Sequence, residues 1–329
     1  MSTPGRSFTD GQGRRIEYLR ISVTDRCNFR CRYCLPTSGV TWLPREELLT
    51  YEEIAEVVRQ VAPLGLRRIR ITGGEPTIRP DLERLIALLR AESHVDDLSL
   101  STNGVHLPRV AARYRAAGLD RVNMSADSLD PARAARIARR DVGFDPLRSL
   151  LAAEAAGLGP IKVNVVLLRG VNDDEIEEFA RLTLAHDWHV RFIELMPVGD
   201  LSDLTERHIV PTPEVIGRIS RLGALSPAAG PAGNGPARYM QLPRGRGTIG
   251  FITPMTHTYC ASCNRVRLTA DGRLRTCLFG THEVDLRTPL RAGIPLVPMI
   301  HAALEDKPRE HELLSLRTGG LRALSQVGG

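Results

Sequence analysis

The six cysteines of this 329-residue chain fall into two triplets, and this spacing constrains the fold more than any other feature. They are Cys27, Cys31 and Cys34, spaced C-x3-C-x2-C, and Cys260, Cys263 and Cys277, spaced C-x2-C-x13-C. Disulfide frameworks belong to short secreted chains, so tight clustering in a chain of this length indicates metal binding instead. The sequence therefore predicts two metal centres, one near each end.

Composition places the chain among ordinary globular proteins. Hydrophobic residues make up 42% and charged residues 25%. No apolar run approaches the length of a membrane span, and the polar first ten residues lack a secretory h-region. We therefore expect a cytoplasmic protein with no membrane partner. The net charge of +6 is compatible with an anionic small substrate or with nucleic acid and decides neither.

The first two-thirds of the chain alternate short β-branched runs with amphipathic helical patterns. The predicted strands are residues 17–24, 67–72, 97–102, 121–126, 161–168 and 189–195, and the predicted helices are 51–64, 82–92, 109–117, 146–156 and 175–186. Such alternation predicts a parallel sheet. Six units fit an incomplete TIM-like (β/α)6 barrel as well as an open sheet, and periodicity alone does not separate the two. We predict the α/β class with the incomplete barrel.

The pattern changes after a helix predicted at 214–222. Residues 224–237 are rich in Pro and Gly and lack both periodicities, which predicts a flexible connection. Short strands follow at 238–242 and 247–252, with a hairpin over 265–278 that turns at Asp271-Gly272. We therefore predict a partial barrel over 1–223, the connection over 224–237, and a smaller C-terminal α+β region over 238–329 that carries the second triplet.

The first triplet directly follows the first predicted strand. Three thiolates on one loop suit a cluster of four irons in which one iron keeps an open position. Loops at the carboxyl ends of parallel strands are where α/β enzymes place their chemistry. A zinc site with a fourth ligand from elsewhere is the alternative, although structural zinc sites favour paired C-x2-C spacings.

The second triplet leaves two interpretations open. C-x2-C is a common zinc spacing, and His257 or His282 could supply a fourth ligand. Without a fourth ligand, the three cysteines would hold a second cluster with an open iron. Strand alternation puts Arg265 and Arg267 on one face, and two guanidiniums beside a metal cluster indicate an anion such as a phosphate, or a nucleobase edge.

The first triplet resembles that of the radical S-adenosylmethionine (SAM) superfamily. Tyr33 stands directly before its third cysteine, and Gly73-Gly74-Glu75-Pro76 follows the second predicted strand, as in that superfamily. More specifically, the chain resembles the GTP 3′,8-cyclases of molybdenum cofactor biosynthesis. The matching stretches are residues 19–34, 43–47, 70–76, 101–104, 192–197 and 263–272, together with the terminal Gly-Gly. Ser101 departs from the usual Thr but keeps a hydroxyl.

The resemblance implies an activity and its cofactors. Two [4Fe-4S] clusters and SAM would generate a 5′-deoxyadenosyl radical, which removes the ribose 3′ hydrogen of GTP. The carbon radical then attacks C8 of guanine to give 3′,8-cyclo-7,8-dihydro-GTP. The family further implies a cyclic pyranopterin monophosphate synthase downstream and a homodimer, with an electron donor that the sequence does not identify.

The resemblance also implies residue roles. Cys27, Cys31 and Cys34 would hold the SAM cluster, and Cys260, Cys263 and Cys277 the auxiliary cluster. Tyr33, Gly74, Ser125 and Met196 would line the SAM site. Arg20, Arg70, Ser101, Lys162, Arg191, Arg265, Val266 and Arg267 would surround GTP, with Arg265 and Arg267 counted as catalytic beside the first triplet. Gly328 and Gly329 would reach into the active site.

Two other functions compete with this one. Another radical SAM enzyme with an auxiliary cluster, such as a peptide-maturing one, would need a peptide-accepting cleft. A zinc-stabilised nucleic-acid-binding protein would bind oligonucleotides with a steep salt dependence. Aromatic residues make up only 5% of the chain, which counts against a single-strand stacking platform. We therefore predict no nucleic-acid partner.

Overall fold

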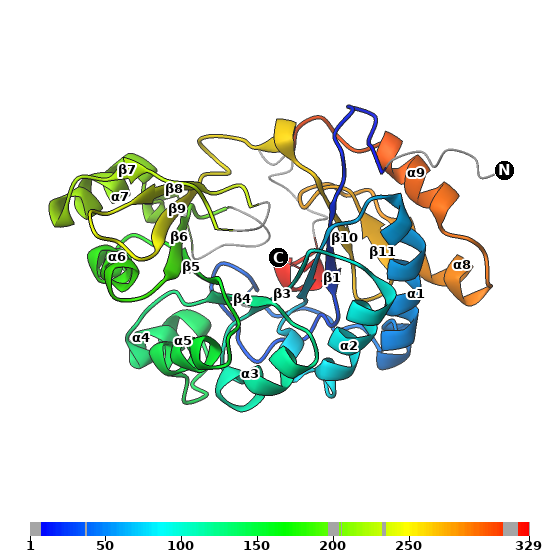
Figure 1. Ribbon diagram of the computed structural model, residues 1–329, viewed down its shortest axis with the longest axis horizontal. Helices are drawn as coiled ribbons and strands as arrows, with labels where there is room; N and C mark the ends of the chain where they lie inside the picture. The colour runs from blue at the N-terminus through cyan, green and yellow to red at the C-terminus, as the bar shows by residue number, and fades with distance from the viewer. Residues whose placement is uncertain are drawn as a thin grey trace.

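A single curved sheet organises the chain in the computed structural model (Figure 1). The structure describes residues 8–36, 38–196, 204, 206–231, 235–311 and 322–328. Within them, twelve strands follow the order β12-β11-β10-β1-β2-β3-β4-β5-β6-β9-β8-β7. No helix in this described part of the chain is long and apolar enough to cross a membrane.

The centre of the sheet is the predicted set of six parallel strands. These are β1 (Tyr18–Ser22), β2 (Arg68–Thr72), β3 (Asp97–Thr102), β4 (Arg121–Ser125), β5 (Ile161–Val166) and β6 (Trp188–Ile193). Because β1 and β6 pair with other strands instead of with each other, the barrel stays open. The predicted incomplete barrel is therefore confirmed.

Helices cover the outer face of this sheet. They are α1 (Tyr51–Val61), α2 (Leu82–Glu92), α3 (Leu107–Ala116), α4 (Pro131–Ala138), α5 (Pro146–Ala155) and α6 (Ile176–Ala185). Local sequence starts several of them, as at α1, where Thr50 and Glu53 form a reciprocal capping box. The sequence analysis missed α4, a short helix that begins after the capping residue Asp130.

The C-terminal region extends the same sheet at both edges. On one side, β10 (Arg265–Leu268) lies parallel to β1, followed by β11 (Arg273–Arg275) and β12 (Val284–Asp285). On the other side, β9 (Thr248–Ile252) lies parallel to β6, followed by β8 (Arg238–Gln241) and β7 (Ser226–Pro227). Helices α7 (Thr212–Ile219), α8 (Arg287–Arg291) and α9 (Val297–Glu305) complete the region. The barrel is thus widened at both ends by strands from one later segment.

Two sequence-predicted features fall within this region. The hairpin that turns at Asp271-Gly272 is confirmed, because β10 and β11 pair antiparallel with Leu268 opposite Leu274. Within residues 224–237, predicted as a connection, β7 pairs with β8, so this part belongs to the edge of the sheet. Residues 232–234 of the same segment lie outside the described residues.

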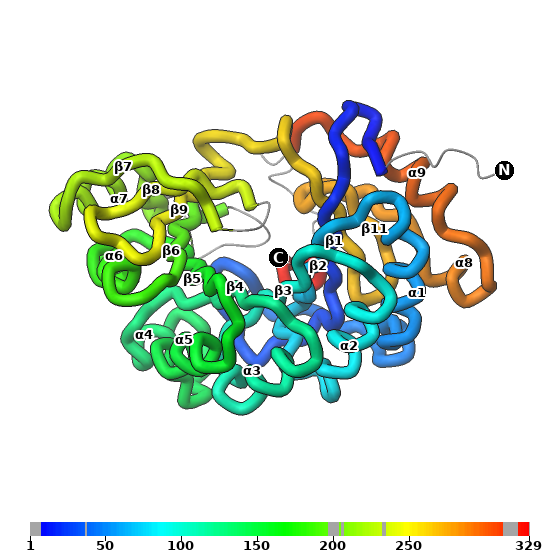
Figure 2. The backbone as a smooth tube through the Cα atoms, viewed as in Figure 1, coloured from blue at the N-terminus to red at the C-terminus, as the bar shows by residue number. Residues whose placement is uncertain are grey.

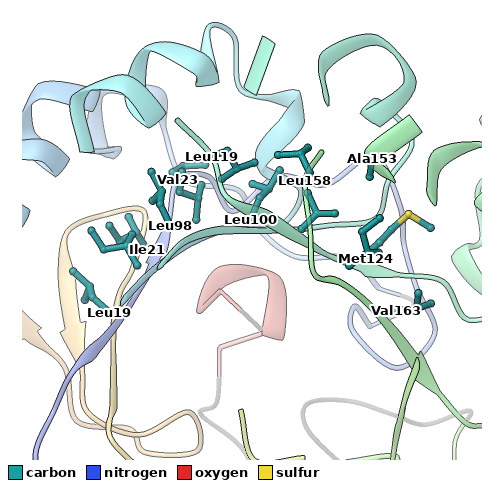
Figure 3. Packing of buried hydrophobic residues seen from close by; sticks show 14 of the residues in the cluster. Leu19, Ile21, Val23, Leu98, Leu100, Leu119, Met124, Ala153, Leu158 and Val163 are labelled. Carbon is teal, nitrogen blue, oxygen red and sulfur yellow. The ribbon is translucent and has the colours of Figure 1, made fainter. Parts of the chain in front are cut away.

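Alternation along the strands separates two faces of different chemistry. Leu19 and Ile21 on β1, Leu98 and Leu100 on β3, and Val163 on β5 are buried against the covering helices (Figure 3). The residues between them face inward and are mostly polar, which departs from the apolar layers that fill a closed barrel. The apolar outer face stabilises the sheet, and the inner face is left for chemistry.

A bidentate ion pair joins two neighbouring strands on the inner face. Arg121 on β4 donates through Nε and Nη2 to the two carboxylate oxygens of Asp97 on β3, at 2.8 and 2.6 Å. Both side chains are largely buried, so their remaining hydrogen bonds must be made within the protein.

Replacing one partner of this pair should destabilise the fold strongly. We expect Arg121→Met to lower the free energy of unfolding by about 3–5 kcal/mol, because it leaves the Asp97 carboxylate buried without its cation. Urea denaturation followed by circular dichroism measures this. The double variant Asp97→Leu/Arg121→Met removes both charges and should recover much of the loss. A loss below about 1 kcal/mol for Arg121→Met would mean that water screens the pair as it does a surface pair.

Candidate active site

Three adjoining cavities run along the inner face of the sheet. The first-triplet cavity, about 150 Å³, contains Cys27, Cys31 and Cys34. The second-triplet cavity, about 60 Å³, contains Cys260, Cys263 and Cys277. The central cavity, about 210 Å³, shares Tyr33, Ser101, Ser125 and Leu324 with the first and Tyr259, Arg265, Arg267 and Leu278 with the second. The two triplets therefore lie at opposite ends of one continuous site.

The loop after β1 brings the first three cysteines together. The amide N–H of Phe29 donates to the Cys27 thiol at 3.3 Å, and the amide of Cys34 donates to the Cys31 carbonyl at 3.0 Å. Burial raises the pKa of Cys27 to about 12 and that of Cys34 to about 11. Buried thiols of this kind become thiolates when a metal supplies positive charge among them.

The donor set at each triplet is three cysteine thiols, which is the usual protein ligand set of an iron–sulfur cluster with one open iron. Within the described residues, no three Cys, His, Asp or Glu side chains converge closely enough to hold one metal ion. An iron–sulfur cluster binds its thiolates through several different irons. His257 and His282, considered from sequence as zinc ligands, are both exposed, and His311 is the histidine that lines the second-triplet cavity in the described part of the chain.

Gly74 allows the loop after β2 to lie close against the loop after β1. Its amide donates to the Thr24 carbonyl at 2.7 Å, and a Cβ atom there would lie 2.2 Å from the Arg26 carbonyl oxygen. Any larger residue would therefore push the two loops apart. The neighbouring Glu75 is buried, and its carboxylate accepts from the hydroxyl of Thr102 at 2.8 Å and the amide of Asn103 at 2.7 Å. The motif thus ties three loops around the cavity.

Tyr33 is held by an acidic residue that the sequence analysis missed. Its hydroxyl donates to Asp127 Oδ2 at 2.6 Å, and the amide of Val166 donates to Asp127 Oδ1 at 2.9 Å. Burial raises the pKa of Asp127 to about 6, although both hydrogen bonds oppose the shift. The available signal was its place just beyond the carboxyl end of β4, where α/β enzymes put functional groups.

Cations crowd the middle of the inner face. Arg20 on β1 is directly opposite Arg70 on β2 and Arg267 on β10, so three guanidiniums share one level of the sheet. Arg191 on β6 donates to Asn123 Oδ1 at 3.1 Å, and its buried Nε has no hydrogen-bond partner among the described residues. Lys162 is fully buried beside them.

Burial and crowding lower the pKa values of these cations. Burial, reinforced by repulsion from neighbouring arginines, lowers the pKa of Lys162 to about 6, that of Arg20 to about 9 and that of Arg267 to about 10. It lowers the pKa of Arg70 and Arg191 as well. Buried cations in excess of carboxylates favour a bound polyanion, which relieves the repulsion and replaces lost hydration.

The C-terminal segment, residues 322–328, lies at the centre of the molecule, within the curve of the sheet (Figure 2). The Gly328 carbonyl accepts from Arg20 Nε and Nη2 at 3.2 and 3.0 Å, and also from Arg267. Upstream, Arg322 donates to both oxygens of Asp271 at 3.0 Å. Leu324 packs with Phe279 in a small apolar cluster that includes Cys34 and Cys277. The segment therefore touches both triplets, while Gly329 lies outside the described residues.

Most of the sequence-predicted site residues meet in these cavities. The central cavity is lined by Arg20, Tyr33, Arg70, Ser101, Ser125, Arg191, Met196, Arg265 and Arg267. The Val266 side chain does not line the cavity, because strand alternation turns it into the apolar core, so its predicted contact with GTP stays a prediction. Lys162 lies buried at the edge of this group and does not line the cavity. Sequence reasoning missed Tyr18, Asn164, Glu194 and Tyr259, which also line it.

Comparisons with known proteins agree with this arrangement. Sequence profiles match the Radical SAM superfamily over residues 21–183 and Molybdenum Cofactor Synthesis C over residues 188–313. A GTP 3′,8-cyclase from Moorella thermoacetica is 47% identical over 321 residues, which cover 96% of this chain and 98% of that protein. A GTP 3′,8-cyclase from Listeria monocytogenes is 38% identical over 328 residues, covering 97% and 98%.

A solved structure shows the same fold. Crystalline SuiB from Streptococcus suis, bound to S-adenosylmethionine, superposes with a TM-score of 0.59 and covers 94% of this chain and 77% of that one. The two sequences are 12% identical, so the likeness concerns the fold alone.

A methyl group at Gly328 should dislodge the C-terminal segment. The residue has a φ of +70°, and a Cβ atom would lie 2.8 Å from Thr72 Cγ2. We expect Gly328→Ala to raise amide hydrogen exchange over residues 324–327 at least about tenfold.

Gly293→Ala provides the matched control for this prediction. Gly293 has nearly the same φ, +71°, but its Cβ would meet no atom within 4 Å. The control therefore carries the same backbone strain without the clash. Equal protection of residues 324–327 in both variants would show that the contact with Thr72 does not hold the segment.

Proposed function

The chain belongs to the GTP 3′,8-cyclase family of the radical SAM superfamily, and we propose a role for each part of its site in that reaction. The family catalyses the first step of molybdenum cofactor biosynthesis, and its reaction uses SAM and [4Fe-4S] clusters, one of them in the C-terminal region. One observation carries the assignment of roles: a continuous cavity joins the two cysteine triplets, and buried cations lie between them.

The first triplet would hold the cluster that binds SAM. Cys27, Cys31 and Cys34 supply three thiolates, and the fourth iron is left to the amino and carboxylate groups of SAM. When bound and reduced, this cluster would supply a 5′-deoxyadenosyl radical from SAM. The protein's part is to seat SAM on the Gly74 loop and to orient Tyr33 through Asp127. Ser125 lines both the first-triplet and central cavities, so it would face SAM and GTP alike.

The central cations would bind the triphosphate of GTP. Arg20, Arg70 and Arg191 line this cavity, and a guanidinium pairs with phosphate oxygens in a planar, two-pronged manner. Burial lowers the pKa of all three, so a bound anion would stabilise their charged forms. Ser101 would add a hydroxyl donor at the junction with the first-triplet cavity. This placement leaves the ribose between the two triplets.

The second triplet would hold the auxiliary cluster and meet the guanine base. Arg265 and Arg267 line both the central and the second-triplet cavities, so they stand where base and phosphate join. The Arg265 side chain also hydrogen-bonds the Cys263 thiol, which ties substrate binding to the cluster loop. Leu324 and Phe279 pack against Cys34 and Cys277, and these apolar side chains would help to keep water away from a radical.

The polyanion requirement separates this function from its rivals. A peptide substrate would not need the buried cations of β1, β2 and β6, because a peptide carries no phosphate. A nucleic-acid interface would present its cations on an exposed face for the phosphate backbone, whereas Arg20, Arg70 and Arg191 are each at most 9% exposed.

The further partners follow from the family. The product of the proposed reaction is 3′,8-cyclo-7,8-dihydro-GTP, and a cyclic pyranopterin monophosphate synthase would consume it. The homodimer and an external electron donor stay predictions.

GTP-dependent cleavage of SAM tests the proposed function. Protein reconstituted anaerobically with iron and sulfide, then reduced, should form 5′-deoxyadenosine from SAM many-fold faster with GTP than without it. Mass spectrometry measures this nucleoside and the cyclised nucleotide together. Equal cleavage with and without GTP would assign the substrate to another class. Zinc in place of iron, with no cleavage, would favour the nucleic-acid-binding alternative.

Lys162 should take up a proton when GTP binds. Its folded pKa of about 6 lies below the usual 10.5, so at pH 8 the side chain in the free protein is mostly the uncharged amine. Lys162 does not line the central cavity, but it interacts with Arg70 and Arg191, which do. The negative charge of a triphosphate bound there should raise the pKa of Lys162, and binding should consume up to about one proton. Titration calorimetry at pH 8 in two buffers of different ionisation enthalpy measures this uptake.

Two variants make this prediction specific. Lys162→Met should abolish the uptake, whereas Arg246→Met, which removes an exposed cation, should retain it. The sign also sets a stability effect, because the unfolded chain binds the extra proton between about pH 6 and pH 10.5. As the pH rises through that range, the free energy of unfolding of the free wild-type protein should therefore increase relative to that of Lys162→Met. An unchanged proton uptake in Lys162→Met would contradict the prediction.

A further inference from the structure

Lys307 is buried against the second triplet, just beyond the end of α9. Only 3% of the residue is exposed. Its ammonium donates to the Cys263 thiol at 3.6 Å, to the Arg265 carbonyl at 3.2 Å and to the Thr276 carbonyl. All three ammonium donors therefore have acceptors, and one of these is a proposed cluster ligand.

These contacts join the separate pieces of chain that carry the second triplet. Cys263 ends the 3-10 turn η7 (Cys260–Ser262), Arg265 begins β10, and Thr276 directly precedes Cys277. The spacing between the second and third cysteines leaves a hairpin between them. A single buried ammonium thus holds both sides of that hairpin at the point where the cysteines meet.

The segment that carries Lys307 is itself fixed on the cysteine loop. Arg14 donates to the Cys260 carbonyl at 2.8 Å and to the Pro308 carbonyl at 2.7 Å, so it links the first cysteine of the triplet to the residue after Lys307. Asp10 holds this guanidinium at 2.6 Å. Figures 1 and 2 show the N-terminal segment lying beside α9. Lys307 is therefore not free to swing away from Cys263.

The hydrogen bond to Cys263 has an electronic consequence. Positive charge and N–H donors at a ligand sulfur favour the more reduced, more negative state of an iron–sulfur cluster. Cys263 receives donors from both Lys307 and Arg265. Arg265 also faces the central cavity, where it would contact substrate, whereas Lys307 lines none of the three cavities. Lys307 can thus influence the cluster without touching the substrate.

We propose that Lys307 is a positioning residue of the second cluster, which holds the Cys263 thiolate and raises the reduction potential of that cluster. The inference rests on the proposed assignment of Cys260, Cys263 and Cys277 as cluster ligands. In this proposal, the Lys307 ammonium places a positive charge beside the cluster that the three cysteine ligands alone do not provide. The same ammonium also fixes the start of β10, where Arg265 and Arg267 lie, through its hydrogen bond to the Arg265 carbonyl.

The test isolates the second cluster in the full chain. Cys27, Cys31 and Cys34 are replaced by Ser, so that the second triplet alone can carry iron after anaerobic reconstitution. Lys307→Met, Lys307→Gln and Lys307→Arg are made in this background. Iron content and a redox titration followed by electron paramagnetic resonance are then measured without any substrate.

The proposal predicts a definite order among the variants. Lys307→Met and Lys307→Gln should lower the equilibrium constant for one-electron reduction at least tenfold, which is about 59 mV. Lys307→Arg keeps the charge and should stay within about threefold of the background protein. Arg246→Met removes an exposed cation that contacts Ala185 and should leave the potential unchanged.

Full iron content with an unchanged potential in Lys307→Met would overturn the proposal. Loss of the cluster in the Met and Gln variants, restored by Arg, would support the need for a cation at Cys263. Loss in all three variants would assign Lys307 to packing and overturn it. Absence of iron from the background protein itself would show that the proposed second cluster site is wrong, before Lys307 is considered.

Discussion

Repulsion among buried cations is the constraint on which this site depends. Arg20, Arg70 and Arg267 occupy one level of three adjacent strands, and Lys162 and Arg191 lie further along the same face. The sheet can tolerate this arrangement because its outer face supplies the apolar packing. The Arg121–Asp97 pair neutralises one further cation of that face. The inner face is therefore built for a polyanionic ligand, at a cost in the stability of the free protein.

The open barrel solves a second problem, which is how to place two metal centres at one substrate. The first triplet lies on the loop after β1, and the second lies beside β10, which pairs with that same strand. The pairing of β1 with β10 thus sets the separation between the two triplets. The C-terminal segment then closes part of the opening, with Leu324 between the triplets and the Gly328 carbonyl on Arg20 and Arg267. This carbonyl occupies donors that a phosphate would also use, so ligand and segment must share or exchange them.

The sequence could predict the local features of this structure but not its long-range pairings. The six central strands were predicted because their alternation and helix spacing are local signals, and α4 was missed because eight residues show too little periodicity. The parallel pairing of Tyr18 with Arg265 joins residues far apart in the chain and leaves no local pattern. Spacing identified the cysteines because they lie close together in the sequence. It could not identify Asp127 or Lys307, because these residues reach the triplets only through the fold.

The two lysines of the chain illustrate what spacing could not reveal. Of the 44 Lys and Arg residues, 42 are arginines, yet both lysines are buried. A guanidinium is planar and suits the two oxygens of a phosphate, whereas an ammonium is compact and directs three donors apart. Lys307 uses that geometry to donate to one sulfur and two carbonyl oxygens that belong to three different residues. Burial and the neighbouring arginines lower the pKa of Lys162 to about 6, so its amine, unlike a guanidinium, could gain a proton when an anion binds nearby.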